Sequence, residues 1–337
     1  MDIREVARHA KVSVATVSRA LNRKPNVDSR LVKRVRKAVE ELGYYPNAQA
    51  RALTSGRSRI MGLIVSEITN PFFPEVIQAF ETIAVEHNYE ILLISTVHDP
   101  KRMELAVRRM IERRVDGVAV LTFGMEDSLI DDLRFRRVPL VFVDVAAGVP
   151  GMSNIRIDYR HGIRQAVQHL AALRHVRIAF VTGPLHFKSA EARKVAFEES
   201  LREIGLEVTP ELLVVGDHTM EGGMHALASL AQLSPRPTAV LCSNDLMAIG
   251  VMRQAYEQQI SIPLELSVVG FDDIWLSQFT IPPLTTVEMS QAELAKLAFG
   301  ALIADVERDS ALARCHEYGL ATNLVLRQTT ALAFTGA

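Results

Sequence analysis

The pattern of apolar positions changes once along the chain, near residue 60. Before that point, apolar residues recur every three or four positions in three short runs, which predicts three amphipathic helices. The first run begins at Ile3, and the second follows a candidate N-cap at Ser13. The third leads from a cap at Asp28 or Ser29 to a stop at Gly43. Helix, tight turn, helix and a closing third helix predict a helix-turn-helix unit over residues 1–45.

Beyond residue 60, short apolar runs alternate with amphipathic stretches of helical period. The predicted strands are 60–65, 90–95, 117–121, 140–143, 178–181, 213–215, 239–243 and 267–270, with a further short strand at 285–287. The predicted helices include 74–87, 102–113, 162–173, 192–205 and 246–258. Such alternation is typical of parallel sheets covered on both faces, and so many strands exceed what one doubly wound sheet comfortably takes. The predicted fold is an all-α helix-turn-helix head plus an α/β body of two doubly wound parallel-sheet subdomains with a cleft.

The composition predicts a large apolar core and a reducing, cytoplasmic environment. The chain has 337 residues, of which 48% are apolar, so it can bury an extensive interior. Its two cysteines, Cys242 and Cys315, exclude a disulfide framework beyond one bridge and favour buried thiols in a reducing cytosol. The N-terminus opens on charged residues, and no apolar run approaches the ~18 residues that span a bilayer. We therefore expect a soluble, cytoplasmic protein without membrane contact.

Charge is divided unevenly between the two parts of the chain. Residues 1–59 hold 14 Lys and Arg against 5 Asp and Glu, and the remaining residues hold 24 against 34. The basic residues 1–59 suit binding to a polyanion such as nucleic acid, whereas the acidic remainder of the chain does not. A solvated basic face without a ligand would give the same count, so charge alone leaves both interpretations open.

The second predicted helix carries side chains suited to reading DNA. Val14 and Ala15 offer apolar contact to a thymine methyl group, and Arg19 can donate a bidentate pair to guanine. The polar side chains better placed for phosphates are Thr16, Ser18 and Asn22, and Ser13 belongs to the same predicted surface.

The segment 2–10, DIREVARHA, followed by 12–22, VSVATVSRALN, resembles the head of the LacI/GalR family of bacterial transcription regulators. The Val14-Ala15 pair resembles the galactose-repressor type and implies an operator half-site of that general type. Lys11 departs from the glycine usual in the turn, although lysine can adopt a left-handed backbone at some cost. The resemblance implies a homodimer that binds a pseudo-palindromic double-stranded DNA operator.

Residues 46–59 are predicted to be a hinge helix and linker. Pro46 suits a helix start and Gly56 a stop, and the stretch between them is too short for a stable isolated helix. The resemblance implies a hinge helix that forms on DNA, with Leu53 as an apolar wedge in the central minor-groove step. The alternative is a linker leucine that packs on the body. The DNA-binding residues predicted in and just before this segment are Tyr44, Asn47, Ala50 and Leu53.

For residues 60–337 the resemblance implies an effector-binding and dimerisation domain with a periplasmic-binding-protein-like, type I fold. In that fold the chain crosses between subdomains near residues 160, 288 and 322. The expected N-subdomain is then about 60–160 plus 289–322, and the expected C-subdomain is about 161–288 plus 323–337.

Ligands of open parallel sheets lie beyond the carboxyl ends of the strands, so the loops after the predicted strands are the candidate effector site. Asn70 offers an amide and Phe72 a ring face to a sugar or flat ring, against the alternative of an Asn-Pro turn with core aromatics. The resemblance implies that Arg193 and Asp272 contact the ligand, against the alternative of a structural ion pair. The predicted effector-binding residues are Asn70, Phe72, Phe73, Phe123, Arg193, His218, Asn244, Asp272 and Met289.

Three positions depart from sugar-binding relatives. Phe123 lies where many have an acidic residue, His218 where an aromatic ring often stacks, and Met289 where an amide is common. A sugar is the leading prediction for the effector. A sugar acid or phosphate stays open because Arg193 and His218 can meet a negative charge, and a purine base stays open as well.

Motifs for catalysis are missing from the chain. The histidines show no metal pair at helical spacing, and we find no nucleophile elbow, dinucleotide-binding turn or phosphate loop. We therefore predict neither an enzyme nor a cofactor or metal, but a repressor controlled by a small-molecule effector. The alternative is a cytoplasmic sugar-binding protein of the transport class, which the basic head and the lack of a signal peptide oppose. The tail at 331–337 has no heptad repeat, so a dimer is expected rather than a tetramer.

Overall fold

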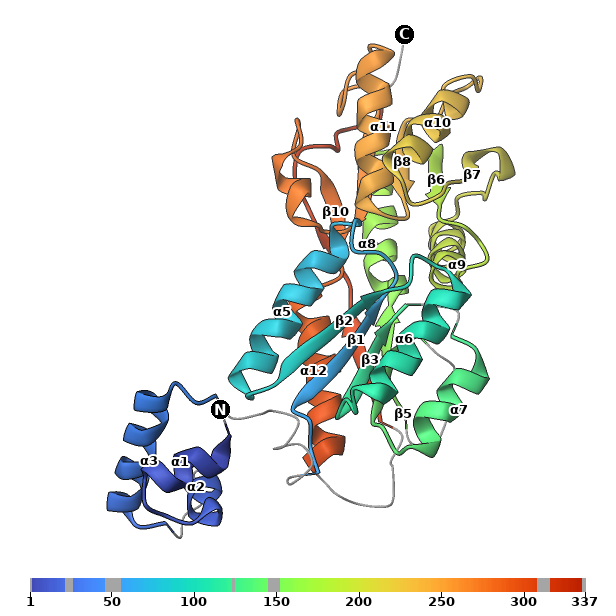
Figure 1. Cartoon of the computed structure of the whole chain (residues 1–337). Coiled ribbons are helices and arrows are strands. Elements are labelled where there is room, and N and C mark those ends of the chain that lie inside the picture. The colour runs from blue at the N-terminus through green and yellow to red at the C-terminus, as the bar shows by residue number, and fades with distance from the viewer. Residues whose placement is uncertain are drawn as a thin grey trace. The chain divides into compact units, whose positions relative to one another are not determined.

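The computed structural model describes residues 2–21, 27–45, 56–122, 125–144, 152–307 and 316–334. The chain forms two compact units, Met1–Arg59 and Ile60–Ala337, which we call the head and the body (Figure 1). Five predicted site residues lie outside the described ranges: Asn22, Asn47, Ala50, Leu53 and Phe123. Most of the predicted hinge lies outside them too.

The head consists of three helices around a small apolar core. The helices are α1 (Ile3–His9), α2 (Val14–Leu21) and α3 (Ser29–Leu42). The buried residues at their centre are Val6, Ala7, Ala10, Val17, Ala20, Val35 and Ala38. These are the apolar positions that recur at helical spacing in the sequence, so the predicted helix-turn-helix unit is confirmed.

Caps and one arginine fix the helix ends of the head. The Thr16 N–H donates to Ser13 Oγ at 3.1 Å, and Asp28 caps α3. Lys11 adopts a left-handed backbone with φ 47°, as the sequence suggested. Arg34 of α3 donates from Nη2 to the carbonyl of Lys11 at 3.1 Å, so the strained turn between α1 and α2 is braced by the third helix.

The first sheet of the body, sheet A, contains six parallel strands in the order β11-β5-β4-β3-β1-β2. They are β1 (Ile60–Val65), β2 (Glu90–Ser95), β3 (Gly117–Leu121), β4 (Leu140–Val143), β5 (Met152–Asp158) and β11 (Glu317–Ala321). On one face lie α5 (Phe72–Glu86) and α12 (Gln291–Glu307), and on the other α6 (Pro100–Glu112) and α7 (Asp127–Phe135) (Figure 1). We call sheet A and these four helices the N-lobe.

The second sheet, sheet B, has the order β12-β10-β9-β8-β6-β7. Its strands are β6 (Ile178–Thr182), β7 (Leu213–Val215), β8 (Ala239–Cys242), β9 (Ser267–Asp272), β10 (Thr285–Glu288) and β12 (Asn323–Val325). One face is covered by α8 (Tyr159–Ala172) and α9 (Lys188–Glu203), and the other by α10 (Met220–Leu230) and α11 (Asp245–Glu257). Short 3₁₀ turns are η1 (Pro210–Leu212) and η2 (Trp275–Phe279). Sheet B with its helices is the C-lobe.

The two-sheet α/β architecture was predicted, but several elements were not. The strands β5, β11 and β12 were absent from the predicted set, and β12 pairs antiparallel with β10, so sheet B is not wholly parallel. Helix α5 begins at Phe72 and α9 at Lys188, earlier than the predicted starts at 74 and 192. No helix in the described residues is long and apolar enough to cross a membrane.

The chain passes between the lobes three times: after β5, after β10, and between β11 and β12. At the third passage a single residue, Thr322, separates the two strands and is fully buried. Its hydroxyl donates to the carbonyl of Asp158 at 2.6 Å and accepts from the N–H of Gly162 at 3.0 Å. One side chain therefore joins the first and third passages.

Candidate functional site

A cavity of about 510 Å³ lies between the lobes, where the strands of both sheets end. Eight of the nine effector-binding residues predicted from the sequence line it: Asn70, Phe72, Phe73, Arg193, His218, Asn244, Asp272 and Met289. The ninth, Phe123, lies outside the described residues. The cavity is where the carboxyl ends of parallel strands are expected to place a ligand.

Arg193 crosses the floor of this cavity from α9 and is 7% exposed. Its Nη1 donates to the carbonyl of Ser243 at 2.5 Å, and its Nη2 lies 3.5 Å from Oδ1 of Asp272. The guanidinium carbon lies 4.1 Å from the centre of the Phe271 ring and 5.0 Å from that of Tyr159. The charge is therefore held by a carboxylate, a carbonyl and two ring faces, while Nε is buried without a hydrogen-bond partner among the described residues.

Asp272 ends β9 with a left-handed backbone, φ 108°, and its side chain is buried. Burial raises the pKa of its carboxyl group to about 7, against the opposing charge of Arg193. Gln291 fixes the strained backbone by donating from Nε2 to the Asp272 carbonyl at 3.0 Å. The carboxyl group thus presents oxygen atoms to the cavity with a single ion-pair partner.

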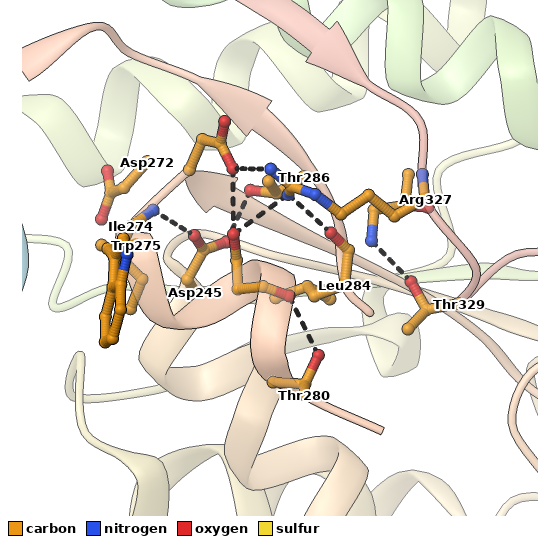
Figure 2. A network of polar contacts seen from close by, with 12 residues as sticks. Asp245, Asp272, Ile274, Trp275, Thr280, Leu284, Thr286, Arg327 and Thr329 are labelled. Carbon is orange, nitrogen blue, oxygen red and sulfur yellow. Dashed lines mark hydrogen bonds and ion pairs between the residues drawn. The ribbon is translucent and has the colours of Figure 1, made fainter. Parts of the chain in front are cut away.

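A polar network behind Asp272 holds the loop that follows it (Figure 2). Asp245 is fully buried at the start of α11, accepting from the Thr286 hydroxyl at 2.5 Å and from the Ile274 N–H at 2.9 Å. Burial, reinforced by the charge of Asp272, raises the pKa of Asp245 well above its ordinary value. Arg327 reaches into the same network, donating to the Leu284 carbonyl at 2.9 Å.

His218 and Asn244 form a unit in which the amide positions the loop. The Asn244 Nδ2 donates to the His218 carbonyl at 3.0 Å, and its Oδ1 accepts from the Met247 N–H at 2.9 Å. Both amide atoms are therefore used inside the protein, which assigns Asn244 to capping α11 and holding the left-handed His218, φ 67°. Burial lowers the pKa of the His218 imidazole to about 3, and Arg193 acts in the same direction. The ring stays neutral near pH 7.

The N-lobe supplies the aromatic wall of the cavity. Asn70 Oδ1 accepts from the N–H of Phe72 at 3.1 Å and so helps to start α5. The rings of Phe72 and Phe73 meet edge to face with 5.4 Å between their centres. Met289 follows β10 and is also buried at the cavity.

Several cavity residues were not predicted from the sequence. Tyr159 donates from its hydroxyl to Asp144 Oδ2 at 2.7 Å, and the Phe187 ring lies 4.8 Å from that of His98. Burial lowers the pKa of His98, and the charge of His186 acts in the same direction. Tyr159 was missed because it follows β5, a strand without a clear apolar run. Phe187 was missed because α9 begins earlier than predicted, although reading every residue just beyond each strand would have found both.

The charges that line the cavity are mostly negative. Its lining contains the carboxyl groups of Glu67, Asp217, Glu221 and Asp272 and only one guanidinium group, that of Arg193. Because burial keeps His218 neutral, it adds no cation to meet an anion. Within the described ranges, no group of three His, Cys, Asp or Glu side chains could hold a metal ion.

In the head, the N-terminal part of α2 is exposed. Ser13, Val14, Ala15 and Arg19 are exposed, Thr16 and Ser18 are half-buried, and Val17 and Ala20 face the core. Tyr44 is half-buried against the head core. A shallow depression beside Ser13 and Val14 is also lined by three cations that were not among the predicted DNA-binding residues: Arg4, Arg8 and Lys11.

Comparison with known proteins finds a matching family model for each of the two units. Residues 2–47 match the bacterial regulatory proteins of the lacI family, and residues 167–330 match the periplasmic binding protein-like domain. Catabolite control protein A of Priestia megaterium is 33% identical over 88% of this chain and 90% of its own. The ribose operon repressor of Escherichia coli K12 is 34% identical over 89% of this chain and 92% of its own.

Among solved structures, the lac repressor dimer bound to operator and the anti-inducer ONPF superposes with a TM-score of 0.86 at 27% identity, covering 98% of this chain and 99% of that one. The relatives found are transcriptional repressors rather than enzymes. On the strength of 34% identity along nearly its whole length, the chain belongs to the lacI family of bacterial regulatory proteins.

Proposed function

We propose that this protein is a repressor whose affinity for operator DNA is set by a small neutral effector in the cavity between its lobes. The observation that carries the proposal is the pairing, in one chain, of an exposed helix-turn-helix surface with a cavity between the lobes that Arg193 and Asp272 line. No catalytic role is proposed. A repressor acts where the bacterial chromosome lies, so its site of action is the cytoplasm.

The head would read DNA with α2 in the major groove. Val14 and Ala15 are exposed at its first turn and suit thymine methyl groups, while the exposed Arg19 suits guanine. Ser13 Oγ accepts from the Thr16 N–H, so it serves as a cap, and its hydroxyl group would donate to a phosphate oxygen. We propose in addition that Asn22, Tyr44, Asn47 and Ala50 complete the contact, with Leu53 as the minor-groove wedge.

The charges of the cavity favour a neutral polyhydroxylated effector, such as a sugar. Arg193 is already committed to Asp272 and Ser243, and His218 stays uncharged, so an anionic ligand would meet surplus carboxylates. Hydroxyl groups can donate to Asp272, and an apolar ring face can lie against Phe72. These features argue against the sugar acid or phosphate that the sequence left open.

We propose a homodimer joined through the bodies, because a pseudo-palindromic operator requires two heads. The relative with a TM-score of 0.86 is a dimer on its operator. Exposed apolar side chains in and after η2 suit such an interface: Trp275 is 60% exposed, Phe279 59% and Ile281 96%. We offer this surface as the place where a second copy packs.

Binding experiments test the proposal directly. An operator selected from random duplexes should bind the protein, with affinity that falls steeply as salt rises and changes when the effector is added. In a thermal-shift screen, neutral sugars should raise the melting temperature, and a saturating ligand at 100 times its Kd stabilises by about 2.7 kcal/mol. Sugar phosphates and sugar acids should not. Sugar binding without any affinity for duplex DNA would instead favour the transport-class alternative.

A further inference from the structure

Two successive helix-to-strand turns of the N-lobe carry the same three residues, Arg-Arg-Val. They are Arg113–Val115 after α6 and Arg136–Val138 after α7. In each turn the second arginine adopts a left-handed backbone, with φ 51° at Arg114 and φ 57° at Arg137. The same left-handed conformation follows other helices of the body, as at Arg174 after α8, so it marks the helix ends, and the chemistry of these turns lies in their charge.

The four arginines of these turns are exposed and form no ion pair with another described residue. No ion pair or side-chain hydrogen bond joins Arg113, Arg114, Arg136 or Arg137 to any residue in the part of the chain that the structure describes. Arg134, in the last turn of α7, instead pairs with Asp131 at 3.0 Å. Glu112 and Asp116 flank the first turn in sequence, and Glu112, Glu126 and Asp132 line a groove with Arg136, but none of them forms an ion pair with the four arginines in the described ranges.

The topology places these turns at the edge of sheet A where the chain enters the body. Strands β1, β3 and β4 are parallel neighbours, so their amino ends share one edge. The Asp116 N–H donates to the carbonyl of Ile60, the first residue of β1, at 2.8 Å. The turn carrying Arg114 thus adjoins the entry of the chain. We call the four residues Arg113, Arg114, Arg136 and Arg137 the arginine edge.

Covalent connection limits how far the arginine edge can be from bound DNA. The three-helix part of the head ends near residue 45 and the body begins at Ile60, so the connection between them is 14 residues long. Such a length spans at most roughly 50 Å even when fully extended. A head seated on its operator therefore keeps this edge within reach of the same duplex.

We propose that the arginine edge is a second, sequence-independent DNA contact that binds the phosphate backbone beside the operator. This inference rests on the proposed function. Guanidinium groups match phosphate geometry and lose hydration easily, which suits them to this partner. The rest of the body is acidic overall, so a cluster of unpaired arginines at this edge restricts attraction for DNA to the side next to the linker.

The test removes the charges and keeps the backbone. The variant combines Arg113→Gln and Arg136→Gln with Arg114→Asn and Arg137→Asn, because asparagine tolerates the left-handed positions. Its affinity for the selected operator is measured by fluorescence anisotropy on duplexes with short and long flanks, across a salt series. We expect the parent to bind long duplexes more tightly and the variant to lose that preference. Each lost phosphate contact should make the plot of log affinity against log salt concentration shallower by about 0.9. Relative to 1 M salt, this corresponds to a loss of roughly eightfold in affinity at 0.1 M salt.

Matched variants separate this surface from general charge effects. Lys101→Gln with Arg102→Gln removes two exposed cations from the other end of α6, for comparison with Arg113→Gln plus Arg114→Asn alone. The proposal is overturned if the arginine-edge variant keeps the parent's flank dependence and salt slope, or if the Lys101 and Arg102 control loses as much. Loss of the effector's thermal shift in the variant would also overturn it, since the edge lies outside the cavity. A parent without operator affinity would mean failure of the proposed function instead.

Discussion

At Asp272 the fold accepts a left-handed backbone and a carboxyl group removed from water, both next to the cavity. Such costs are characteristic of positions that a ligand uses. Asn244 behaves in the opposite way, because both of its amide atoms are satisfied within the protein. Two polar residues that look alike in sequence therefore differ in what they offer to a ligand.

The raised pKa of Asp272 predicts a pH dependence of stability. Its folded value of about 7 lies above the ordinary 3.8, so the folded state binds the proton more tightly. The free energy of unfolding should therefore fall as pH rises from about 4 to 7. Asp272→Asn should flatten this fall by up to a few kcal/mol, since one pKa unit corresponds to about 1.4 kcal/mol. Urea unfolding at pH 5 and pH 8 measures the difference.

A carboxyl group with a lowered pKa provides the control for that comparison. Asp217→Asn should leave the fall in stability between the two pH values unchanged, because, against the effect of burial, hydrogen bonds from Thr219 lower the pKa of Asp217 and the group is ionised at both pH values. An Asp272→Asn protein with the parent's full pH dependence would contradict the prediction. The dependence would then belong to Asp245, whose pKa is also raised by burial.

At the scale of elements, helix caps and apolar runs made most of the fold predictable. The buried strands β1, β3 and β4 are continuous apolar runs, and their predicted bounds match the structure. The strand β5 contains polar residues that break its apolar run. Ser153 and Asn154 are buried, and Arg156 forms an ion pair with Glu317 of β11, which lies far along the chain. The three-residue strand β12 pairs with β10 from a distance in sequence, which no local pattern reveals.

The candidate site was predictable from the sequence only where the strand or helix that positions a residue had been placed correctly. Residues after recognised strands, such as Asn70 and Asp272, were found because strand ends locate the cavity. Tyr159 and Phe187 were not, because one strand and one helix start were misplaced. Whether a side chain faces the ligand or a neighbouring loop depends on tertiary contacts, as Asn244 demonstrates.

The start of α11 gives a prediction at this scale. Asn244→Ala removes the cap and the bond to the His218 carbonyl, so it should cost about 1 kcal/mol of stability and weaken effector binding. Asn244→Asp keeps an acceptor for the Met247 N–H but turns a second oxygen toward the His218 carbonyl in a buried position, so it should lower stability and weaken effector binding as well. Thermal unfolding and calorimetric titration of both variants provide the measurements. Equal effector affinity in parent and Asn244→Asp would refute the positioning role.

At the scale of the molecule, several contacts join the lobes, and two of them involve residues outside the three connecting segments. The N–H of Trp275 in the C-lobe donates to Glu75 Oε1 of α5 at 2.8 Å. The ring of His98 in the N-lobe lies 4.8 Å from that of Phe187 in the C-lobe. Because each residue of these pairs belongs to a different lobe, both contacts depend on the angle between the lobes.

Glu75→Ala should shift the lobes toward a more open arrangement. The bond is exposed and worth about 1 kcal/mol, so effector affinity should fall severalfold while overall stability changes little. Trp275 is the only tryptophan of the chain, and its fluorescence therefore reports on this contact without a label. Glu75→Gln keeps an acceptor and should resemble the parent. An unaltered emission spectrum and effector affinity in Glu75→Ala would show that the contact carries no weight.

The hydroxyl of Thr322 constrains how the lobes can move. It bonds to Asp158 and Gly162 at once, so two of the three connecting segments are pinned to each other at one buried point. Sliding of one sheet past the other would break both bonds, whereas rotation about an axis through this pin preserves them. A rotation of a few degrees about this axis moves atoms farther the farther they lie from it. The displacement would be smallest beside Thr322 and would grow along the N-lobe toward the edge where the linker enters at Ile60.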